Sequence, residues 1–243
     1  MKLNLISNGN TNAKTIKNDQ ETYILYLSPY NLNDTGKNVC PFATKGCAKA
    51  CLNSAGRGKF SNVQLARRRK TNLFFQDPQK FTQDLALDLA KINNKALKEN
   101  KTIFVRLNGT SDINFEKLLN RYLNISFAQF AGLKFYDYTK DKNKALEYST
   151  NEKRVKYRIT YSRSEKDTDM DIKTLLNNGV NVAAVFSKDL PNTYLGYPVI
   201  NGDETDLRFN DQLGVIVGLK AKGAGKKDTS GFVIQSSLIF GYN

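Results

Sequence analysis

Short apolar runs recur along the chain at fairly even spacing, and they predict seven β-strands. The runs are rich in Val, Ile, Tyr and Phe, which favour strands, and polar or turn-rich stretches separate them. In chain order they are Tyr23–Ser28, Thr102–Leu107, Leu133–Tyr138, Val155–Tyr161, Val182–Phe186, Tyr197–Ile200 and Val215–Leu219. Helical patterns lie at Val63–Gln76, Pro78–Leu97, Phe115–Tyr122, Lys142–Tyr148 and Asp171–Asn177. Alternating strands and helices indicate an α/β fold with a largely parallel sheet.

The predicted architecture is a single α/β domain over residues 1–243. Seven strands with crossovers are expected to form a partial or irregular (β/α) barrel with largely parallel strands; a doubly wound sheet is the alternative. Residues 1–20 are polar and rich in Asn, which predicts a loop or an extended arm. Residues 38–58 form a loop that contains every cysteine of the chain.

Polar residues follow each predicted strand, where the loops of a parallel sheet form a common rim. The candidate catalytic residues on this rim are Asp112, Tyr138, Asp203 and Lys220. The candidate cofactor-binding residues are Asn108, Gly109, Ser111, Arg163, Asp206, Arg208 and Lys222. Each has a structural alternative: the Asp203–Arg208 segment reads equally as an Asp-rich turn with a salt bridge, and the two lysines as solvent-exposed side chains.

The cysteines cluster within twelve residues, in the pattern Cys-x6-Cys-x3-Cys at Cys40, Cys47 and Cys51. An odd number of cysteines does not suit disulfides. Three thiolates that leave one coordination position open suit an iron–sulfur cluster. Cys47 and Cys51 are four residues apart, so a helical turn would place them on one face. The loop therefore predicts a metal centre with these three ligands.

Other interpretations of the three cysteines stay open. Free cysteines also occur as small buried apolar side chains. Zinc prefers four ligands and would need a distant carboxylate or water here, because the chain has no histidine. Cys47 and Cys51 could form a redox pair, although their spacing is not that of a CxxC motif.

The absence of histidine removes several classes of enzyme. Ser-His-Asp and Cys-His catalysis, His-ligated zinc sites and the zinc deaminase site all need this residue. The chain also carries 37 Lys and Arg against 23 Asp and Glu, a net charge of +14, which attracts polyanions such as nucleic acid. Its densest basic run is Arg67, Arg68, Arg69 and Lys70, which predicts phosphate contacts or, alternatively, a solvated helix face.

The order of the loop motifs resembles a known family of phage proteins. CPFATKGCAKACLNSAGRGKF, NGTSD, YDYTK, YSRS, NGDETDLRF, VGLKAKG and SGF follow one another as in the gene product 88 family, whose members have no activity that the resemblance could transfer. The resemblance implies a protein of phage origin.

A second, architectural resemblance rests on the cysteine triplet after the first strand of an α/β barrel. It is similar to radical S-adenosylmethionine enzymes, in which three cysteines hold a [4Fe-4S] cluster whose fourth iron binds the cofactor. The spacing here differs from the usual Cys-x3-Cys-x2-Cys, and NGTSD stands where that superfamily has a glycine-rich motif. The resemblance implies the [4Fe-4S] cluster and S-adenosylmethionine as cofactors.

The function expected from the sequence is a radical S-adenosylmethionine-like iron–sulfur enzyme that acts on a nucleotide or a nucleic-acid-related substrate. One alternative is a non-enzymatic, basic nucleic-acid-binding protein with a structural metal site. Another is a protein that binds a host factor. The sequence has neither a signal-peptide pattern nor a stretch apolar enough to cross a membrane, and so we expect the host cytoplasm and no membrane contact.

Overall fold

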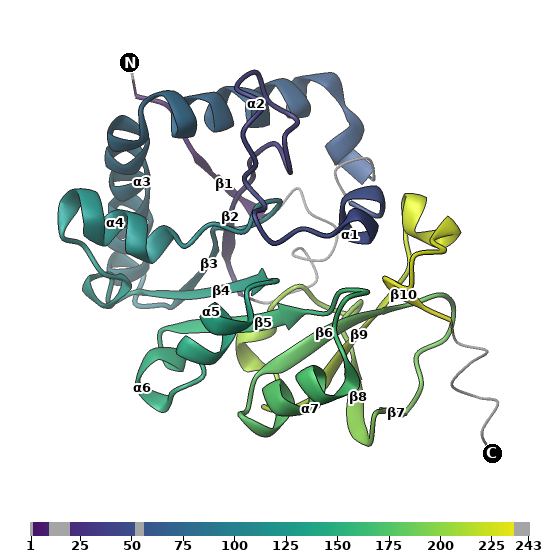
Figure 1. The fold of residues 1–243 in the computed structure, drawn as a ribbon. Helices are drawn as coiled ribbons and strands as arrows, with labels where there is room; N and C mark the ends of the chain where they lie inside the picture. Colours follow the sequence, from purple (N-terminus) through teal and green to yellow (C-terminus); the bar gives the residue numbers. More distant parts are fainter. Residues whose placement is uncertain (1, 10–19, 52–55, 236–243) are drawn as a thin grey trace.

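The computed structural model describes residues 2–9, 20–51 and 56–235, and its strands form one mixed sheet in nearly sequential order (Figure 1). The order is β1-β2-β3-β4-β5-β6-β9-β8-β7, with β10 paired to β6. The strands are β1 Ile6–Asn8, β2 Thr22–Leu25, β3 Ile103–Arg106, β4 Leu133–Thr139, β5 Tyr157–Ser162, β6 Asn181–Phe186, β7 Thr193–Tyr194, β8 Tyr197–Asn201, β9 Ile216–Lys220 and β10 Val233–Ile234. Only the β1–β2 and β7–β8 pairs of the described strands are antiparallel. The predicted α/β fold with a largely parallel sheet is confirmed.

Helices fill most of the crossovers between the parallel strands. They are α1 Lys45–Lys49, α2 Ser61–Gln76, α3 Pro78–Lys98, α4 Phe115–Leu123, α5 Lys142–Glu147, α6 Asn151–Arg154 and α7 Asp169–Asn177. Short 3₁₀ turns are η3 Gly56–Lys59, η4 Phe127–Gln129, η5 Arg208–Asn210 and η6 Gly223–Lys227. None of the helices in these described ranges is long and apolar enough to span a membrane.

Two segments differ from the sequence prediction. Part of the polar arm is a strand: Ile6–Asn8 pairs with β2, and the Asp88 carboxylate accepts hydrogen bonds from the backbone N–H groups of Leu5 and Ile6 at 2.7 and 3.1 Å. Residues 10–19 of the arm lie outside the described residues. Between β6 and β9 the predicted strand Tyr197–Ile200 is present as β8, but it forms a hairpin with β7, which the sequence did not predict.

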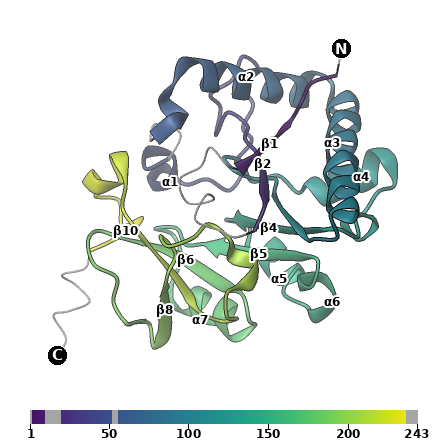
Figure 2. The same cartoon turned by 180° about the vertical axis from the view of Figure 1, so that it is seen from behind.

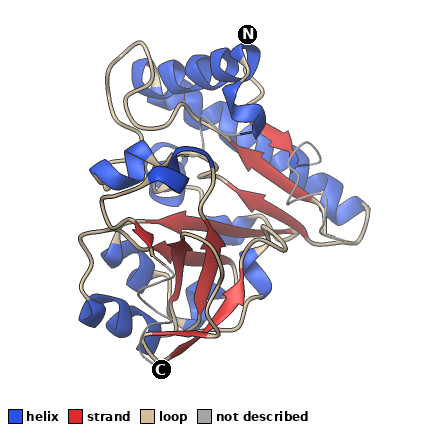
Figure 3. Ribbon diagram, turned by 90° about the vertical axis from the view of Figure 1, so that its right-hand side faces the viewer, coloured by secondary structure: helices blue, strands red, loops and turns tan. Residues whose placement is uncertain are grey.

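The sequential order of β2 to β6 is that of a singly wound sheet. Parallel strands joined in this order by right-handed crossovers place their helices on one face. The pairings among the described strands run from β1 to β7 and include none between these two edges. Figure 2 shows the same arrangement from behind, and Figure 3 shows the strands fanning across the sheet through its twist.

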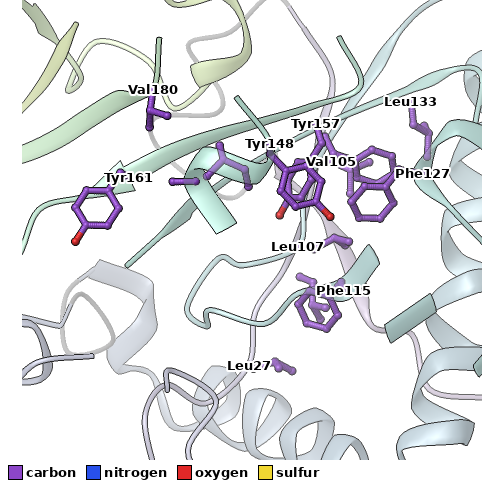
Figure 4. Close-up of a cluster of buried hydrophobic side chains, with 14 of the residues drawn as sticks. Leu27, Val105, Leu107, Phe115, Phe127, Leu133, Tyr148, Tyr157, Tyr161 and Val180 are labelled. Atoms are coloured by element: carbon purple, nitrogen blue, oxygen red, sulfur yellow. The ribbon is translucent and has the colours of Figure 1, made fainter. Parts of the chain in front are cut away.

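Side chains of β3 and β4 alternate between the two faces of the sheet, as the two-residue period requires. On the helical face, Val105, Phe135 and Tyr157 join the main hydrophobic core. The Phe127 and Phe135 rings stack at 3.8 Å between centroids, and the Tyr157 ring meets Phe127 edge-on (Figure 4). On the opposite face, Phe104 and Tyr136 pack against Leu207 and Phe209, so the segment around η5 covers that side.

A buried carboxylate ties β4 to its neighbours directly beneath the rim. Asp137 is 1 % exposed and accepts hydrogen bonds from the Asn108 backbone N–H at 2.7 Å, the Asn108 side-chain amide at 3.1 Å and the Tyr157 hydroxyl at 2.9 Å. Burial raises the pKa of Asp137, against the opposing effects of Lys144 and Arg106. The carboxylate fixes the start of the loop that follows β3.

We predict that Asp137→Ala destabilises the fold by about 3 kcal/mol. The substitution leaves the Asn108 and Tyr157 donors buried without an acceptor, and each such group costs about 1–3 kcal/mol. Urea unfolding followed by circular dichroism measures the change. Asp34→Ala is the matched control, because its ion pair with Arg68 is exposed and we expect a loss below about 1 kcal/mol. Equal losses in both variants would contradict the role of Asp137.

Candidate functional site

A cavity of about 290 Å³ opens at the carboxyl ends of the parallel strands. Loops after β2, β3, β4, β8 and β9 contribute to its wall, as the shared rim predicted, whereas β5 and β6 contribute Ser162 and Val185 from the strands themselves. The candidate residues that line it are Cys40, Cys47, Cys51, Asn108, Gly109, Ser111, Asp112, Tyr138, Asp203, Asp206, Lys220 and Lys222. Fold topology therefore brings together residues that are up to 182 positions apart, from Cys40 to Lys222.

All three cysteines line this cavity, half-buried and outside any disulfide. The Cys40 thiol donates to the Thr110 carbonyl at 3.7 Å, which joins the cysteine loop to the loop after β3. Cys47 lies in the short helix α1, but α1 ends at Lys49, so Cys51 follows the helix instead of sharing its last turn. Residues 52–55 of the predicted cysteine loop lie outside the described residues.

Burial is the main influence on the pKa values of Cys40 and Cys47. It raises the pKa of Cys40 to about 12, and the neighbouring Cys51, Asp112 and Cys47 raise it further. Burial also raises the pKa of Cys47, while the positive charge of Lys140 opposes the shift. The Cys40 and Cys47 thiols are therefore protonated near neutral pH, and a bound metal would displace their protons because metal ligands are thiolates.

Glu165, in the loop after β5, holds α1 against the rim. Its carboxylate accepts hydrogen bonds from the Thr44 hydroxyl at 2.7 Å and from the Gly46 backbone N–H at 3.0 Å. Thr44 is also the N-cap of α1 and accepts from the Cys47 backbone N–H. Burial would raise the pKa of Glu165, but these hydrogen bonds bring it below its ordinary value, so the carboxylate is ionised at neutral pH.

Asp112 in the loop after β3 and Lys140 in the loop after β4 connect these two loops to each other and to the end of β5. The Asp112 carboxylate accepts from the Thr139 hydroxyl at 2.7 Å and from the Lys140 backbone N–H at 2.8 Å. The Lys140 ammonium donates to the backbone carbonyls of Ser162 and Arg163 at 2.9 and 3.0 Å. Burial lowers the pKa of Lys140, whereas the nearby Cys47 raises it. This network places a cation beside Cys47.

An ion pair lies on the face of the sheet opposite the helices and also lines the cavity. The Arg106 guanidinium donates to the Asp206 carboxylate at 2.8 Å and lies 4.9 Å from the centre of the Tyr138 ring. Burial lowers the pKa of Arg106, but Asp206 and the neighbouring tyrosines together raise it above its ordinary value, so the arginine is charged. The hydroxyl of fully buried Tyr136 has no hydrogen-bond partner.

A second acidic group forms the opposite side of the cavity. The Asp203 carboxylate accepts from the Lys220 backbone N–H at 2.7 Å and from the Lys222 ammonium at 2.7 Å. The Lys220 ammonium points instead to Asp189 at 3.5 Å. The predicted acid pair and lysines thus share one site, and the carboxylates are engaged in ion pairs or backbone contacts.

Two predicted cofactor-binding residues lie outside the cavity lining. Arg163 donates to the carbonyls of Gly231 and Phe232, and thereby positions the segment before β10. Arg208 is buried beneath η5, where its guanidinium lies 3.2 Å from Asp211 and donates to the Thr205 carbonyl. For Arg208, this geometry is that of the salt-bridged turn that the sequence offered as the alternative.

The basic run on α2 divides between two faces. Arg68 and Arg69 are exposed, whereas Arg67 and Lys70 are buried. The Arg67 guanidinium lies 4.8 Å from the Tyr26 ring, and the Lys70 ammonium donates to the Leu5 carbonyl at 2.6 Å. Burial lowers the pKa of Lys70 to about 8. Only half of the predicted phosphate-binding run therefore faces solvent.

Sequence reasoning missed Arg106, Lys140 and Glu165 as site residues. Arg106 had a usable signal, because a charged residue inside the apolar run TIFVRL points from a strand into a polar space. Lys140 and Glu165 follow predicted strands like the chosen residues, but nothing in the sequence separates them from other surface charges.

The comparisons with known proteins add one finding. A family model described as Gene product 88 matches residues 4–236. The chain belongs to the gene product 88 family. This confirms the resemblance that the loop motifs indicated. Searches of curated proteins and of solved structures return no match for this member of the family.

The three cysteines of this gene product 88 protein are its candidate ligands for a metal centre. Among the described residues, no group of three or more Cys, Asp or Glu side chains is arranged to hold a metal ion. Zinc would need its ligands converged on one ion. A [4Fe-4S] cluster places each cysteine on a different iron, so the cysteine sulfurs lie around the whole cluster and do not converge on a single ion. The three thiols line one cavity, which is what such a cluster would require of its ligands.

We predict that Glu165→Ala makes Cys47 react several-fold faster with a thiol reagent in metal-free protein. The loss of the Thr44 and Gly46 hydrogen bonds frees α1 from the rim and exposes its half-buried thiol. Alkylation at mildly alkaline pH, with the modified cysteine identified by mass spectrometry, measures the rate. Glu152→Ala removes an exposed carboxylate and serves as the control. Unchanged Cys47 reactivity would show that Glu165 does not anchor α1.

Proposed function

We propose that this gene product 88 protein is an iron–sulfur enzyme of the radical S-adenosylmethionine-like kind. Its cluster is held by Cys40, Cys47 and Cys51. One observation supports this most: the three cysteines of a single loop face the same cavity, and that cavity lies where parallel α/β sheets form their sites. A cluster with three protein ligands keeps one iron open toward the remaining space.

The surroundings of the thiols suit such a cluster. Lys140 places a positive charge near Cys47, which stabilises the thiolate form that a metal requires. Charge and hydrogen bonds around the sulfurs set the potential of an iron–sulfur cluster. When bound, the cluster would supply an electron to a ligand in the cavity, and the chain's own residues would orient that ligand and limit its contact with water.

The rest of the cavity suits a ligand with both charges, such as S-adenosylmethionine. Its wall carries the carboxylates Asp112 and Asp203 together with the cations Lys220 and Lys222. An amino-acid group with an ammonium and a carboxylate can exchange partners with these ion pairs. Tyr138 and Arg106 offer flat surfaces on the opposite side.

We predict that Cys47→Ala loses most of its iron and sulfide. Protein reconstituted without oxygen should be brown, with broad visible absorbance and iron and sulfide in cluster ratio. Removing one of three ligands should abolish this signature. Lys49→Ala changes an exposed residue of the same helix and should retain it. Colourless wild-type protein with stoichiometric zinc would overturn the cluster and favour a structural metal site.

We also predict that the reduced, reconstituted protein cleaves S-adenosylmethionine. Asp112→Asn should lower this activity at least tenfold while the iron content stays the same, because the substitution weakens the network that positions Lys140 beside the cavity. Chromatography of the cleavage products measures the rate. Asp141→Asn, which alters the N-cap of α5 outside the cavity lining, is the control. Protein with an intact cluster that does not cleave S-adenosylmethionine would contradict the proposed enzymatic activity, while its assignment as an iron–sulfur protein would stand.

A further inference from the structure

The positive charge of this protein is concentrated in one segment. Residues 35–76 contain nine Lys and Arg and no Asp or Glu, so +9 of the net +14 resides there. The nine residues are Lys37, Lys45, Lys49, Arg57, Lys59, Arg67, Arg68, Arg69 and Lys70. The segment includes the cysteine loop, and so the part of the chain with the highest positive charge also contributes to the wall of the cavity through its cysteines.

The α1 region of this segment has two faces. Cys47 of α1 and the flanking residues Ala43, Ala50 and Cys51 line the cavity. Lys45 and Lys49 lie between them in sequence and are exposed. The same turn of chain therefore presents sulfur to the cavity and ammonium groups to solvent.

The exposed charges continue onto the neighbouring elements. α1, η3 and the start of α2 follow one another closely in the chain, at Lys45–Lys49, Gly56–Lys59 and from Ser61 onward. Arg57 and Lys59 of η3 are exposed, as are Arg68 and Arg69 of α2. Arg68 also pairs with Asp34 at 3.4 Å, so it contributes less than the others. The result is a basic surface, formed by Lys45, Lys49, Arg57, Lys59 and Arg69, next to the cavity.

Exposed aromatic rings flank this basic surface. Among the described residues the exposed large aromatic side chains are Tyr30, Phe42 and Phe60, at 41 %, 47 % and 52 % exposure. Phe42 precedes α1 and Phe60 joins η3 to α2, so both lie within the basic segment. Isolated exposed apolar residues need no explanation, but rings combined with cations are the chemistry of single-stranded nucleic-acid sites.

We propose that this surface binds single-stranded nucleic acid and presents it to the cavity. Phosphates would contact the lysines and arginines, and unpaired bases would stack on Phe42 and Phe60. Duplex bases are already stacked on one another, so the rings favour single strands. The proposal assigns a substrate class to the proposed enzyme and rests on that function only for the chemical step, not for binding.

Fluorescence anisotropy with labelled single-stranded DNA and RNA tests the surface. The triple variant Lys45→Ala, Lys49→Ala, Lys59→Ala should bind at least tenfold more weakly at low salt. Its slope of log affinity against log salt should be smaller by about 2, since each lost contact to a single strand removes about 0.7. The control Lys91→Ala, Lys98→Ala, Lys173→Ala removes the same charge from exposed positions on α3 and α7. Equal weakening in both triples would overturn the proposal in favour of general charge attraction.

A second pair of variants tests stacking. Phe42→Ala with Phe60→Ala should weaken single-strand binding roughly tenfold per ring and leave the salt slope unchanged. Leu97→Ala with Met170→Ala, at exposed positions elsewhere, should have no effect. Polyglutamate or anionic vesicles that bind as tightly as the single strands would overturn the proposal and identify an acidic protein or a membrane surface as the partner. The DNA and RNA arms decide between the two nucleic acids.

Iron analysis of the same variants separates this proposal from the proposed enzyme. The lysine and phenylalanine variants should keep their iron and lose nucleic acid. Cys47→Ala should lose iron and still bind single strands. Wild-type protein that holds a cluster but binds neither DNA nor RNA would contradict the proposed nucleic-acid surface and leave the proposed iron–sulfur enzyme standing.

Discussion

The parallel pairing of consecutive strands is the constraint on which the site depends. From β2 to β6 each strand pairs in parallel with the next one in sequence, and β9 continues the sheet. All of their carboxyl ends therefore meet at one edge. Polar loops that are far apart in the chain then face one another without needing specific contacts to bring them there. The contacts made by Asp112, Lys140 and Glu165 refine this arrangement but do not create it.

Burial and charge are balanced differently on the two sides of that edge. Below this edge, the buried Asp137 carboxylate accepts hydrogen bonds from the Asn108 backbone N–H and the Tyr157 hydroxyl, and these bonds stabilise the fold. Above it, carboxylates and cations of the cavity wall form pairs such as Asp203 with Lys222, which remain partly exposed. Exposed pairs gain little from each other and can exchange partners at low cost. A ligand with charged groups therefore competes more easily at the rim than beneath it.

Much of the fold followed from the hydrophobic pattern, because strand and helix periods are local properties of the sequence. All seven predicted strands have counterparts in the structure, and α2, α3, α4, α5 and α7 match the predicted helices. β1, β7 and β10 were missed because three or fewer residues per strand carry no readable period. For the site, position after a strand was enough to predict that Asp112 and Asp203 line the cavity. The same rule did not hold for Arg163 and Arg208, because their side chains turn to backbone carbonyls or to a neighbouring acid.

The basic run on α2 shows why a count of charges could not locate a binding surface. Arg67 and Lys70 are three residues apart, so they share the helix face that packs inward, while Arg68 and Arg69 face outward. The inward pair contacts Tyr26 and the Leu5 carbonyl, which costs desolvation but leaves the charge close to Cys51. The helical period therefore places the four residues of this basic run in two environments, one buried and one exposed to solvent. The inward cations contact the interior of the protein, and only the outward ones remain for a polyanion.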